Sequence, residues 1–208
     1  MDQAVERVLA VPTEKLRPYL TGCGLLRDRA DEIFRVILEN HVFLPRPAAE
    51  ADPGYRQIIP YVALLRGEEV FSTRRLRGGT ETRLHGRIAL GVGGHINPET
   101  DGDGDDVLLR GLRREIEEEV AIDGGLDLTA LHFEGIINDD ANEVSLVHLG
   151  LFCTLPVTGE VTVRETAKLA GAWLRRDALP DLAPEMETWS SLVIDALRPA
   201  PGVPLYGA

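Results

Sequence analysis

The sequence predicts an α+β fold, in which β-strands come before and after one strongly amphipathic helix. Strand patterns separated by turn signals fill residues 58–92. A helical repeat of apolar residues follows at 107–120, and further strand patterns lie at 128–155. The chain closes with a second helical repeat at 186–197. Strands followed by a helix, more strands and a final helix indicate an α+β sandwich.

Length and composition limit the class of protein before any motif is considered. A chain of 208 residues accommodates one domain with an appendage and can bury a sizeable core. It has no apolar run near the ~20 residues needed to cross a bilayer, and no secretion signal. Cys23 and Cys153 stand in different contexts and are expected to be buried free thiols. These features predict a cytoplasmic protein without membrane association.

The net charge of −12 bears on the ligands that the chain can bind. General nucleic-acid binding requires a basic surface that displaces counterions from phosphates, so the acidic balance argues against it. A small phosphorylated ligand stays compatible with this charge, because a bound metal and a few arginines can reverse the local sign.

The first part of the chain, residues 1–55, reads as an appendage of short elements. A strand is expected at 5–11, and Thr13 is expected to cap a brief helix. Helical spacing of apolar residues predicts a helix at 28–40. Residues 44–55 are rich in proline and small residues and are expected to form a connector. The appendage would pack on the main domain or on a second subunit, which leaves a homodimer open.

The main domain is expected to span residues 56–197, and an extended tail follows at 198–208. Its first two strands form a hairpin around the turn at Arg66-Gly67. The expected strands, in chain order, are 58–65, 69–76, 81–92, 128–137, 144–155 and 171–174.

The helix at 107–120 has two different faces. Its apolar stripe consists of Leu108, Leu112, Ile116 and Val120, with Leu109 beside them. Glu115, Glu118 and Glu119 stand at i, i+3 and i+4 on another face, near the negative end of the helix dipole. A hard divalent cation such as Mg²⁺ would supply the missing positive charge. A solvated acidic surface is the alternative interpretation.

These glutamates belong to a longer pattern. Residues 114–122 read REIEEEVAI, which resembles the second half of the Nudix box, R-E-U-x-E-E-x-G-U with U aliphatic. Ala121 stands where the family has glycine. The box as a whole would span about residues 93–122, and the resemblance covers about residues 56–197.

The first half of the box is altered. Residues 93–99, GGHINPE, resemble the family's Gly-Gly turn and first acid, with residues 101–105 as an insertion. Either Glu99 or Asp106 would replace the first glutamate of the box. Glu99 is favoured because it follows the turn at nearly the family's distance, and Asp106 would then cap the helix.

The resemblance implies a fold, an activity and a cofactor. The fold would be a Nudix-type α/β/α sandwich with a mixed β-sheet. The enzyme would be a pyrophosphohydrolase in which an activated water attacks phosphorus in a diphosphate linkage, with Mg²⁺ or Mn²⁺ as cofactor. Its substrate would be a nucleoside diphosphate-linked or similar small molecule. The alternative is a Nudix-fold module that binds a nucleotide-like ligand without turnover.

Carried over residue by residue, the resemblance assigns the functional side chains. Glu118 and Glu119 would be metal ligands, and Glu115 would be a ligand or the general base. Arg114 would orient a box carboxylate, and the carbonyl of Gly94 would be a further ligand.

Arginines cluster in the strands that lead to the box. Guanidinium groups suit phosphate because their donors form a permanently charged fork. Alternate strand residues point to opposite faces, so at most about half can reach one cleft; charged strand edges are the alternative. The residues proposed to bind substrate are Arg74, Arg83, Arg87 and Glu99.

Further carboxylates and two histidines complete the candidates. Carboxylates from the far side of the cleft are expected among Asp139, Asp140, Glu143 and Glu165. His95 and His148 have no companion at metal-ligand spacing, and they are expected to be packing or hydrogen-bonding residues.

Overall fold

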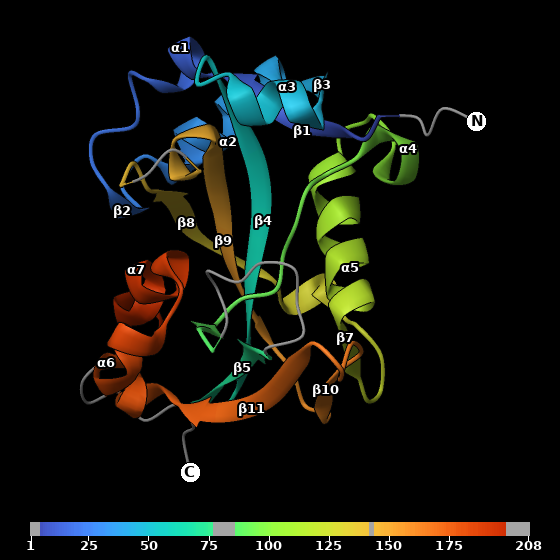
Figure 1. Ribbon diagram of the computed structural model, residues 1–208, viewed down its shortest axis with the longest axis vertical. Coiled ribbons are helices and arrows are strands. Elements are labelled where there is room, and N and C mark those ends of the chain that lie inside the picture. The colour runs from blue at the N-terminus through green and yellow to red at the C-terminus, as the bar shows by residue number, and fades with distance from the viewer. Residues whose placement is uncertain (1–4, 77–85, 142–143, 199–208) are drawn as a thin grey trace. The chain divides into compact units, whose positions relative to one another are not determined.

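The computed structural model describes residues 5–76, 86–141 and 144–198 (Figure 1). The chain forms two compact units. Unit 1 consists of Met1–Tyr61, Gly93–Ile116 and Phe133–Cys153, and unit 2 of Val62–Val92, Glu117–His132 and Thr154–Ala208. These units do not follow the division at residues 55 and 197 that the sequence suggests.

Four elements have residues in both units: β4 (Tyr55–Arg66), α5 (Val107–Glu119), β8 (His132–Asn138) and β9 (His148–Pro156). Among the described residues, no helix has the length and apolar character required to span a membrane.

Unit 1 is built from N-terminal strands that pair with strands from later in the chain. Its other strands are β1 (Arg7–Pro12), β2 (Gly24–Leu26), β3 (Val42–Pro45) and β8 (His132–Asn138). β1 pairs antiparallel with β3 and with the start of β4, where Ala10 lies opposite Gln57. β2 pairs antiparallel with β8, and β9 lies between β8 and β4. Residues from the predicted appendage therefore supply three strands of this sheet.

β4 and β9 are parallel, which makes the sheet mixed. The guanidinium of Arg56 donates to the carbonyl of His148, and the ring of Tyr61 contacts the ring of Phe152. Residue numbers therefore rise together along the two strands. Together with the helices, this confirms the predicted α+β class.

One face of the unit 1 sheet carries the main apolar core, to which two helices contribute. Helix α2 (Ala30–Asn40) buries Ala30, Ile33 and Ile37 at the predicted helical spacing, and α5 buries Val107 and Leu108. The cluster that they join also contains Leu9, Val11, Leu16, Ile58, Ile96, Ile136, Leu149 and Leu151. Leu109, expected beside this stripe, is instead exposed.

The segment 44–55, predicted as a connector, is ordered and partly helical. It contains the end of β3 and the helix α3 (Arg46–Ala51), which starts after Pro45 and has a proline in its first turn. Proline is favoured there because the missing N–H would have no helical partner. Ala49 is fully buried, so the small residues that suggested a loop allow close packing instead.

Two further N-terminal predictions differ from the structure. The brief helix α1 (Thr13–Leu16) begins after Pro12, and the Thr13 hydroxyl donates to the carbonyl of Pro53 rather than capping the helix. Cys23 was expected to be buried and is exposed, whereas Cys153 is buried as predicted.

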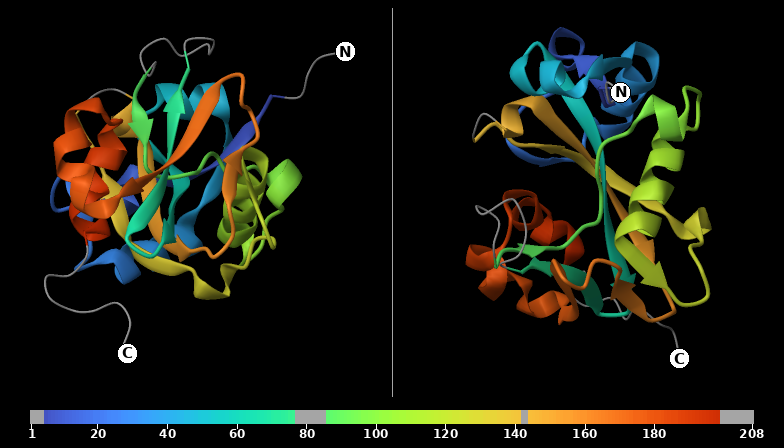
Figure 2. Two further views of the ribbon diagram at one scale, coloured as in Figure 1. Left: turned by 90° about the horizontal axis from the view of Figure 1, so that it is seen from below. Right: turned by 45° about the vertical axis from the view of Figure 1, so that its right-hand side comes forward.

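Unit 2 contains the predicted hairpin and the C-terminal elements. β4 turns at Gly67, which has a φ of 56°, into β5 (Glu69–Arg75). β11 (Leu169–Arg175) pairs with the whole of β5 and is longer than the strand predicted at 171–174. From β11 the chain continues through η4 (Arg176–Ala178), α6 (Leu179–Leu182) and η5 (Ala183–Glu185) into α7 (Thr188–Leu197) (Figure 2, orange to red).

The remaining elements of the structure are short. A two-stranded sheet pairs β7 (Val120–Ile122) with β10 (Val161–Val163). The first five residues of the strand predicted at 81–92 lie outside the described residues. In the described remainder, 86–92, the strand is limited to β6 (Ile88–Ala89). The 3₁₀ turns η2 (Leu128–Ala130) and η3 (Ser145–Val147) precede β8 and β9, and α4 (Pro98–Asp101) precedes α5.

Candidate active site around helix α5

The Gly-Gly turn at residues 93–94 lies directly against Glu115 of α5. A Cβ atom built on Gly94 would stand 2.4 Å from Cδ and Oε2 of Glu115. Only a glycine therefore fits beside this carboxylate without moving it. The side chain of Glu115 is 14% exposed. The structure thus brings together two residues that the box pattern places 21 positions apart along the chain, counting from 94 to 115.

Arg114 fixes the turn to the helix through several hydrogen bonds. Its Nη1 donates to Oε1 of Glu115 at 2.8 Å, and its Nη2 donates to the carbonyl of His95 at 2.7 Å. Nη2 also reaches Oδ1 of Asn97 at 3.3 Å. The predicted role of Arg114, orienting a box carboxylate, agrees with this geometry.

Asp101, which the sequence did not single out, binds Arg114 through both of its carboxylate oxygens. Its Oδ1 accepts from Nε at 2.8 Å and its Oδ2 from Nη2 at 2.9 Å, a fork-to-fork pair. The Asp101 side chain is 2% exposed. The hydrogen bonds that Arg114 donates to this carboxylate are the largest cause of the raised pKa of Arg114. Asp101 thus pairs with the box arginine, whereas Glu99 and Asp106, the two candidates for the first box acid, pair with Arg7 and Arg110.

Local structure explains why Asp101 reaches the helix. Asn97 and Pro98 start the single turn α4, and Gly102 ends it with a φ of 74°. The turn points Asp101 at α5, where Gly111 stands one turn before Arg114. A Cβ on Gly111 would lie 3.2 Å from Oδ2 of Asp101, so the helical glycine permits this close approach.

Glu99 and Asp106 are engaged elsewhere at the surface. The carboxylate of Glu99 accepts from Nε of Arg7 at 2.8 Å, and that of Asp106 pairs with Arg110. Both carboxylates are at least half exposed. This geometry argues against Glu99 as the first box acid. Both that alignment and a role of Glu99 in substrate binding stay predictions.

The last turn of α5 carries the remaining box glutamates. Glu118 is exposed and Glu119 partly buried, and no basic residue lies in this turn. Arg164 follows the helix end: its N–H donates to the carbonyl of Glu119, and its Nε donates to that of Val120 at 3.2 Å. A cation there offsets part of the negative end of the dipole.

The two glycines of the turn make a matched pair of tests. Gly94→Ala is expected to displace the flexible Glu115 carboxylate while leaving the fold intact, so activity falls and the melting temperature stays near wild type. Gly93→Ala would bring a Cβ to 1.8 Å from the carbonyl oxygen of Pro60, which is backbone and cannot yield cheaply. That change should destabilise by about 1–3 kcal/mol or more. Thermal melts of both variants, with turnover of Gly94→Ala, check the contrast, and equal melting temperatures would contradict it.

The predicted substrate-binding arginines are tied to the C-terminal segment of unit 2. Arg74 donates to the carbonyl of Gly86 and pairs with Glu185 at 2.9 Å. Nη1 of Arg87 donates to the carbonyl of Pro184 at 2.6 Å. Arg83 lies outside the described residues. Whether these guanidinium groups bind substrate stays a prediction.

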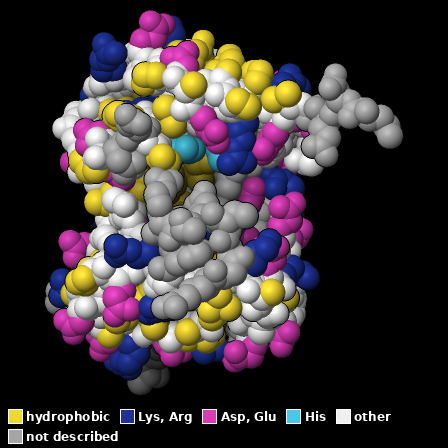
Figure 3. All heavy atoms as spheres, viewed as in Figure 1, with side chains coloured by type: hydrophobic (Ala, Val, Ile, Leu, Met, Phe, Trp, Pro, Cys, Tyr) yellow, Lys and Arg dark blue, Asp and Glu magenta, His cyan; other side chains and the backbone are white. Residues whose placement is uncertain are grey.

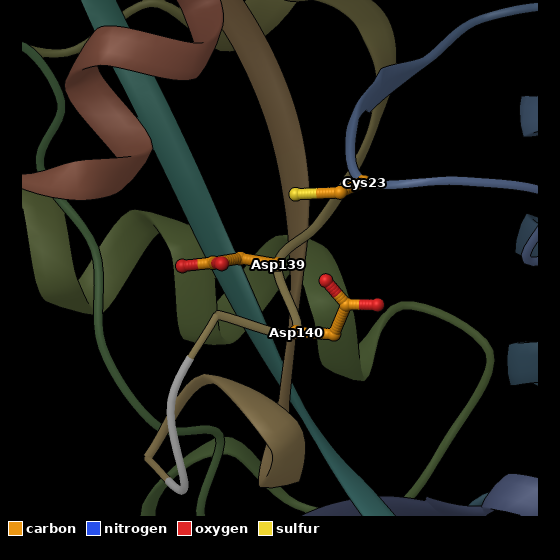
Figure 4. A group of neighbouring side chains, drawn as sticks. All are labelled: Cys23, Asp139 and Asp140. Carbon is orange, nitrogen blue, oxygen red and sulfur yellow. The ribbon is translucent and has the colours of Figure 1, made fainter.

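Two of the candidate far-side carboxylates lie beside a thiol. Within the described parts of the chain, Cys23, Asp139 and Asp140 bring one ligand atom each to within 4.8 Å of one another (Figure 4). Both oxygens of the buried Asp139 already accept hydrogen bonds, from the N–H of Ala141 and the hydroxyl of Ser145. Asp139 therefore orders its own turn, as Asx turns do, and the group carries no assignment as a metal site. Glu143 lies outside the described residues, and Glu165 pairs with Lys168.

Two histidines adjoin the Gly-Gly turn. The rings of His95 and His148 pack edge to face, with centroids 5.6 Å apart. Burial lowers the pKa of His95 to about 4, and burial also lowers the pKa of His148. Both rings are therefore neutral at pH 7. The predicted packing role is correct, although their mutual contact was not foreseen.

On the face shown in Figure 3, acidic and basic side chains are interspersed. Elsewhere among the described residues, exposed ion pairs include Arg175 with Asp177 and Lys168 with Glu165. Such pairs contribute little to stability individually.

Comparison with known proteins adds the family. No protein-family model matches the chain. It is 37% identical over 207 residues to protein YmaB of Bacillus subtilis (strain 168), covering 95% of this chain and 100% of that protein. The solved structure of Tm1382, a candidate Nudix hydrolase, superposes with a TM-score of 0.79 at 30% identity, covering 92% of this chain and 98% of that one.

A more distant structure agrees in fold alone. The Nudix hydrolase from Alicyclobacillus acidocaldarius superposes with a TM-score of 0.53 at 16% identity, over 68% of this chain and 90% of that one. The fold is thus the Nudix-type sandwich that the box residues implied. The chain belongs to the Nudix hydrolase family, and its enzyme class is that of a Nudix-type pyrophosphohydrolase.

Proposed function

We propose that this protein hydrolyses a diphosphate linkage in a nucleoside diphosphate-linked or similar small molecule, with Mg²⁺ or Mn²⁺ bound by Glu115, Glu118 and Glu119. The observation that carries the proposal is the position of the Glu115 side chain. Its carboxylate is held by Arg114 against the backbone of Gly94, with no room for a side chain on that glycine.

The donor set fits a hard divalent cation. Mg²⁺ prefers carboxylate and carbonyl oxygens with retained waters. Helix α5 carries three carboxylates at i, i+3 and i+4, and the first of them, Glu115, lies against the backbone of Gly94. The positions i, i+3 and i+4 place these carboxylates on neighbouring turns of α5. When bound, such an ion neutralises charge on phosphoryl oxygens and lowers the pKa of a bound water.

The chain's own residues would then have separate tasks. Glu118 and Glu119 would bind the divalent cation, and the carbonyl of Gly94 would offer it a further oxygen. Glu115 would either bind the cation or accept the proton of the attacking water. Arg114 orients Glu115, and by donating to the carbonyl of His95 it holds the Gly-Gly turn close to α5. Asp101 acts through Arg114 and is a positioning residue.

A substrate screen tests this proposal directly. Phosphate or nucleotide release would be measured with MgCl₂ or MnCl₂ on nucleotide sugars, dinucleotides, NADH, ADP-ribose and nucleoside triphosphates. Turnover of at least one diphosphate-linked compound, abolished by a chelator, is the expected result. Absence of turnover across the whole panel, with a folded protein, would favour a binding module instead.

Metal binding should also be visible in stability. Four glutamates between residues 115 and 119 repel one another near the negative end of α5. A cation that binds only the folded cluster stabilises by RT ln(1 + [L]/Kd), about 2.7 kcal/mol at a hundredfold excess over Kd. MgCl₂ or MnCl₂ should therefore raise the melting temperature more than NaCl of matched ionic strength does.

The double variant Glu118→Gln/Glu119→Gln is the control for this melting series. It should melt at or above the metal-free wild type, because repulsion is relieved, and it should lose the divalent response. An equal response of the variant and wild type to MgCl₂ would show that the cation binds elsewhere.

A further inference from the structure

Gln57 is a fully buried polar side chain without a partner for either end of its amide. It lies in β4, it has no exposed surface, and both Nε2 and Oε1 are shielded and make no hydrogen bond. Buried amides are normally satisfied, and leaving both ends unmade is costly. Its strand neighbour Ala10 is too small and too apolar to supply a partner.

Gln57 shares one face of the unit 1 sheet with His148. The ring contact between Tyr61 and Phe152 shows that these two residues lie on one face of the parallel strands β4 and β9. Side chains alternate between the two faces of a sheet, so residues four positions earlier on each strand lie on the same face. These residues are Gln57 and His148, which are therefore side by side. Ile58 and Leu149 point the other way, into the apolar core.

His95 completes the group. Its ring packs on that of His148, and its Nε2 is buried without a hydrogen-bond partner. The short segment that carries it is fixed to two strands. Gly93 lies against the carbonyl of Pro60 in β4, and the carbonyl of Ile96 accepts from the N–H of Leu9 in β1. Three unsatisfied polar atoms therefore lie on two side chains that both adjoin His148.

This group also adjoins the proposed reaction site within unit 1. His95 directly follows Gly94, whose backbone lies against the carboxylate of Glu115. The carbonyl of His95 is held by Arg114. The side chain of His95, beside Gln57 and His148, and the Glu115 carboxylate are thus linked through adjacent backbone residues, His95 and Gly94. A molecule bound at Gln57 could therefore extend past this segment to Glu115.

We propose that Gln57, His95 and His148 form a specificity subsite for a planar ring of the substrate that carries a hydrogen-bond donor beside an acceptor. This inference rests on the proposed function, because it assigns the ring-bearing part of the same substrate. The amide of Gln57 offers a donor and an acceptor side by side, which match the edge of a carboxamide or of a nucleobase. The imidazoles supply flat surfaces and one further nitrogen at Nε2 of His95.

The specificity follows from the cost of unsatisfied groups. A ring with the matching edge would satisfy both ends of the amide, whereas a ring without it would leave them unpaired as in the free protein. Because the amide is shielded in the ligand-free chain, entry of a ring requires displacement of a covering side chain, and the two imidazoles are its polar neighbours.

Binding of nucleosides to the metal-free protein tests the subsite without requiring turnover. Calorimetric titrations would use adenosine, inosine and uridine, with purine riboside as the matched ligand that lacks the donor. We expect wild type to bind at least one of the three at least about tenfold tighter than purine riboside. Gln57→Met, which keeps the volume and removes both polar ends, should weaken that nucleoside at least about tenfold.

Stability provides an independent readout. Gln57→Met should melt at or above wild type, since it removes unsatisfied buried groups, and Gln57→Leu gives a second apolar replacement. His132→Phe, an exposed histidine outside the group, should keep wild-type binding. Absence of binding by wild type to all three nucleosides would overturn the subsite, as would unchanged discrimination in both Gln57 variants. A failed hydrolysis screen with intact discrimination would instead overturn only the catalytic proposal.

Discussion

Replacing both Glu118 and Glu119 by glutamine is expected to reduce kcat/KM by about a thousandfold or more. A bound cation contributes several kcal/mol of charge stabilisation in the transition state, and each 1.36 kcal/mol is tenfold in rate. Glutamine keeps the size and helix propensity of glutamate, so the fold should be retained. Steady-state kinetics over a range of MgCl₂ concentrations would measure the loss.

Glu117→Gln is the matched control for this experiment. It removes one charge from the same turn of α5, at an exposed position outside the i, i+3, i+4 set. Its kinetics should stay close to wild type. Wild-type turnover in the double variant would overturn the assignment of Glu118 and Glu119 as metal ligands. An equal loss in Glu117→Gln would show that the acidic face acts only through its net charge.

Asp101→Asn is expected to have the second largest effect, and it should act on stability and catalysis together. The change removes the charge of a carboxylate whose side chain is 2% exposed and leaves Arg114 partly unpaired. Breaking a buried pair by removing one partner costs about 3–5 kcal/mol, and the 21% exposure of Arg114 lowers this to about 2–4 kcal/mol. The turn held by Arg114 should loosen, so kcat should fall even where the protein remains folded.

Glu99→Gln and Asp106→Asn are the controls that discriminate the three acids. Both carboxylates form exposed pairs, with Arg7 and Arg110, and should leave melting temperature and kcat close to wild type. Denaturant unfolding and kinetics on the three variants would rank them. A larger loss of stability and kcat in Glu99→Gln than in Asp101→Asn would favour Glu99 as the first acid of the box.

Helix α5 was predictable because the sequence pattern that indicates it is local. Apolar residues every fourth position fix the buried side of α5, and the remaining positions place Glu115 and Glu118 on another face. The hairpin of β4 and β5 was also predictable, since strand patterns flank a glycine with positive φ. In both cases the residues that determine the structure are neighbours in sequence.

Asp101 could not be assigned because its partner is distant in sequence and the intervening length is altered. Residues 101–105 looked like an acidic insertion, and the pattern alone does not show which acid turns inward. Asn97-Pro98 followed by Gly102 was the available signal, since it marks a single helical turn with defined ends. Gly111, a helix-weakening residue, was a second sign of close approach.

The N-terminal region was misjudged for a related reason. α3 has six residues and a proline in its first turn, so its composition resembles a loop. Its stability comes from tertiary contacts, as is usual for short helices. Gln57 was equally hidden, because one polar residue within an apolar strand does not reveal whether its amide finds a partner.

The different surroundings of the two cysteines make the natural chain suitable for site-selective labelling. Burial raises the pKa of the Cys153 thiol to about 12, so thiolate is scarce there at neutral pH, whereas Cys23 is exposed. Since these are the only two cysteines in the sequence, a maleimide dye should attach to Cys23 alone without any substitution. The dye would sit beside Asp139 and Asp140, where its fluorescence could report ligand binding to unit 1.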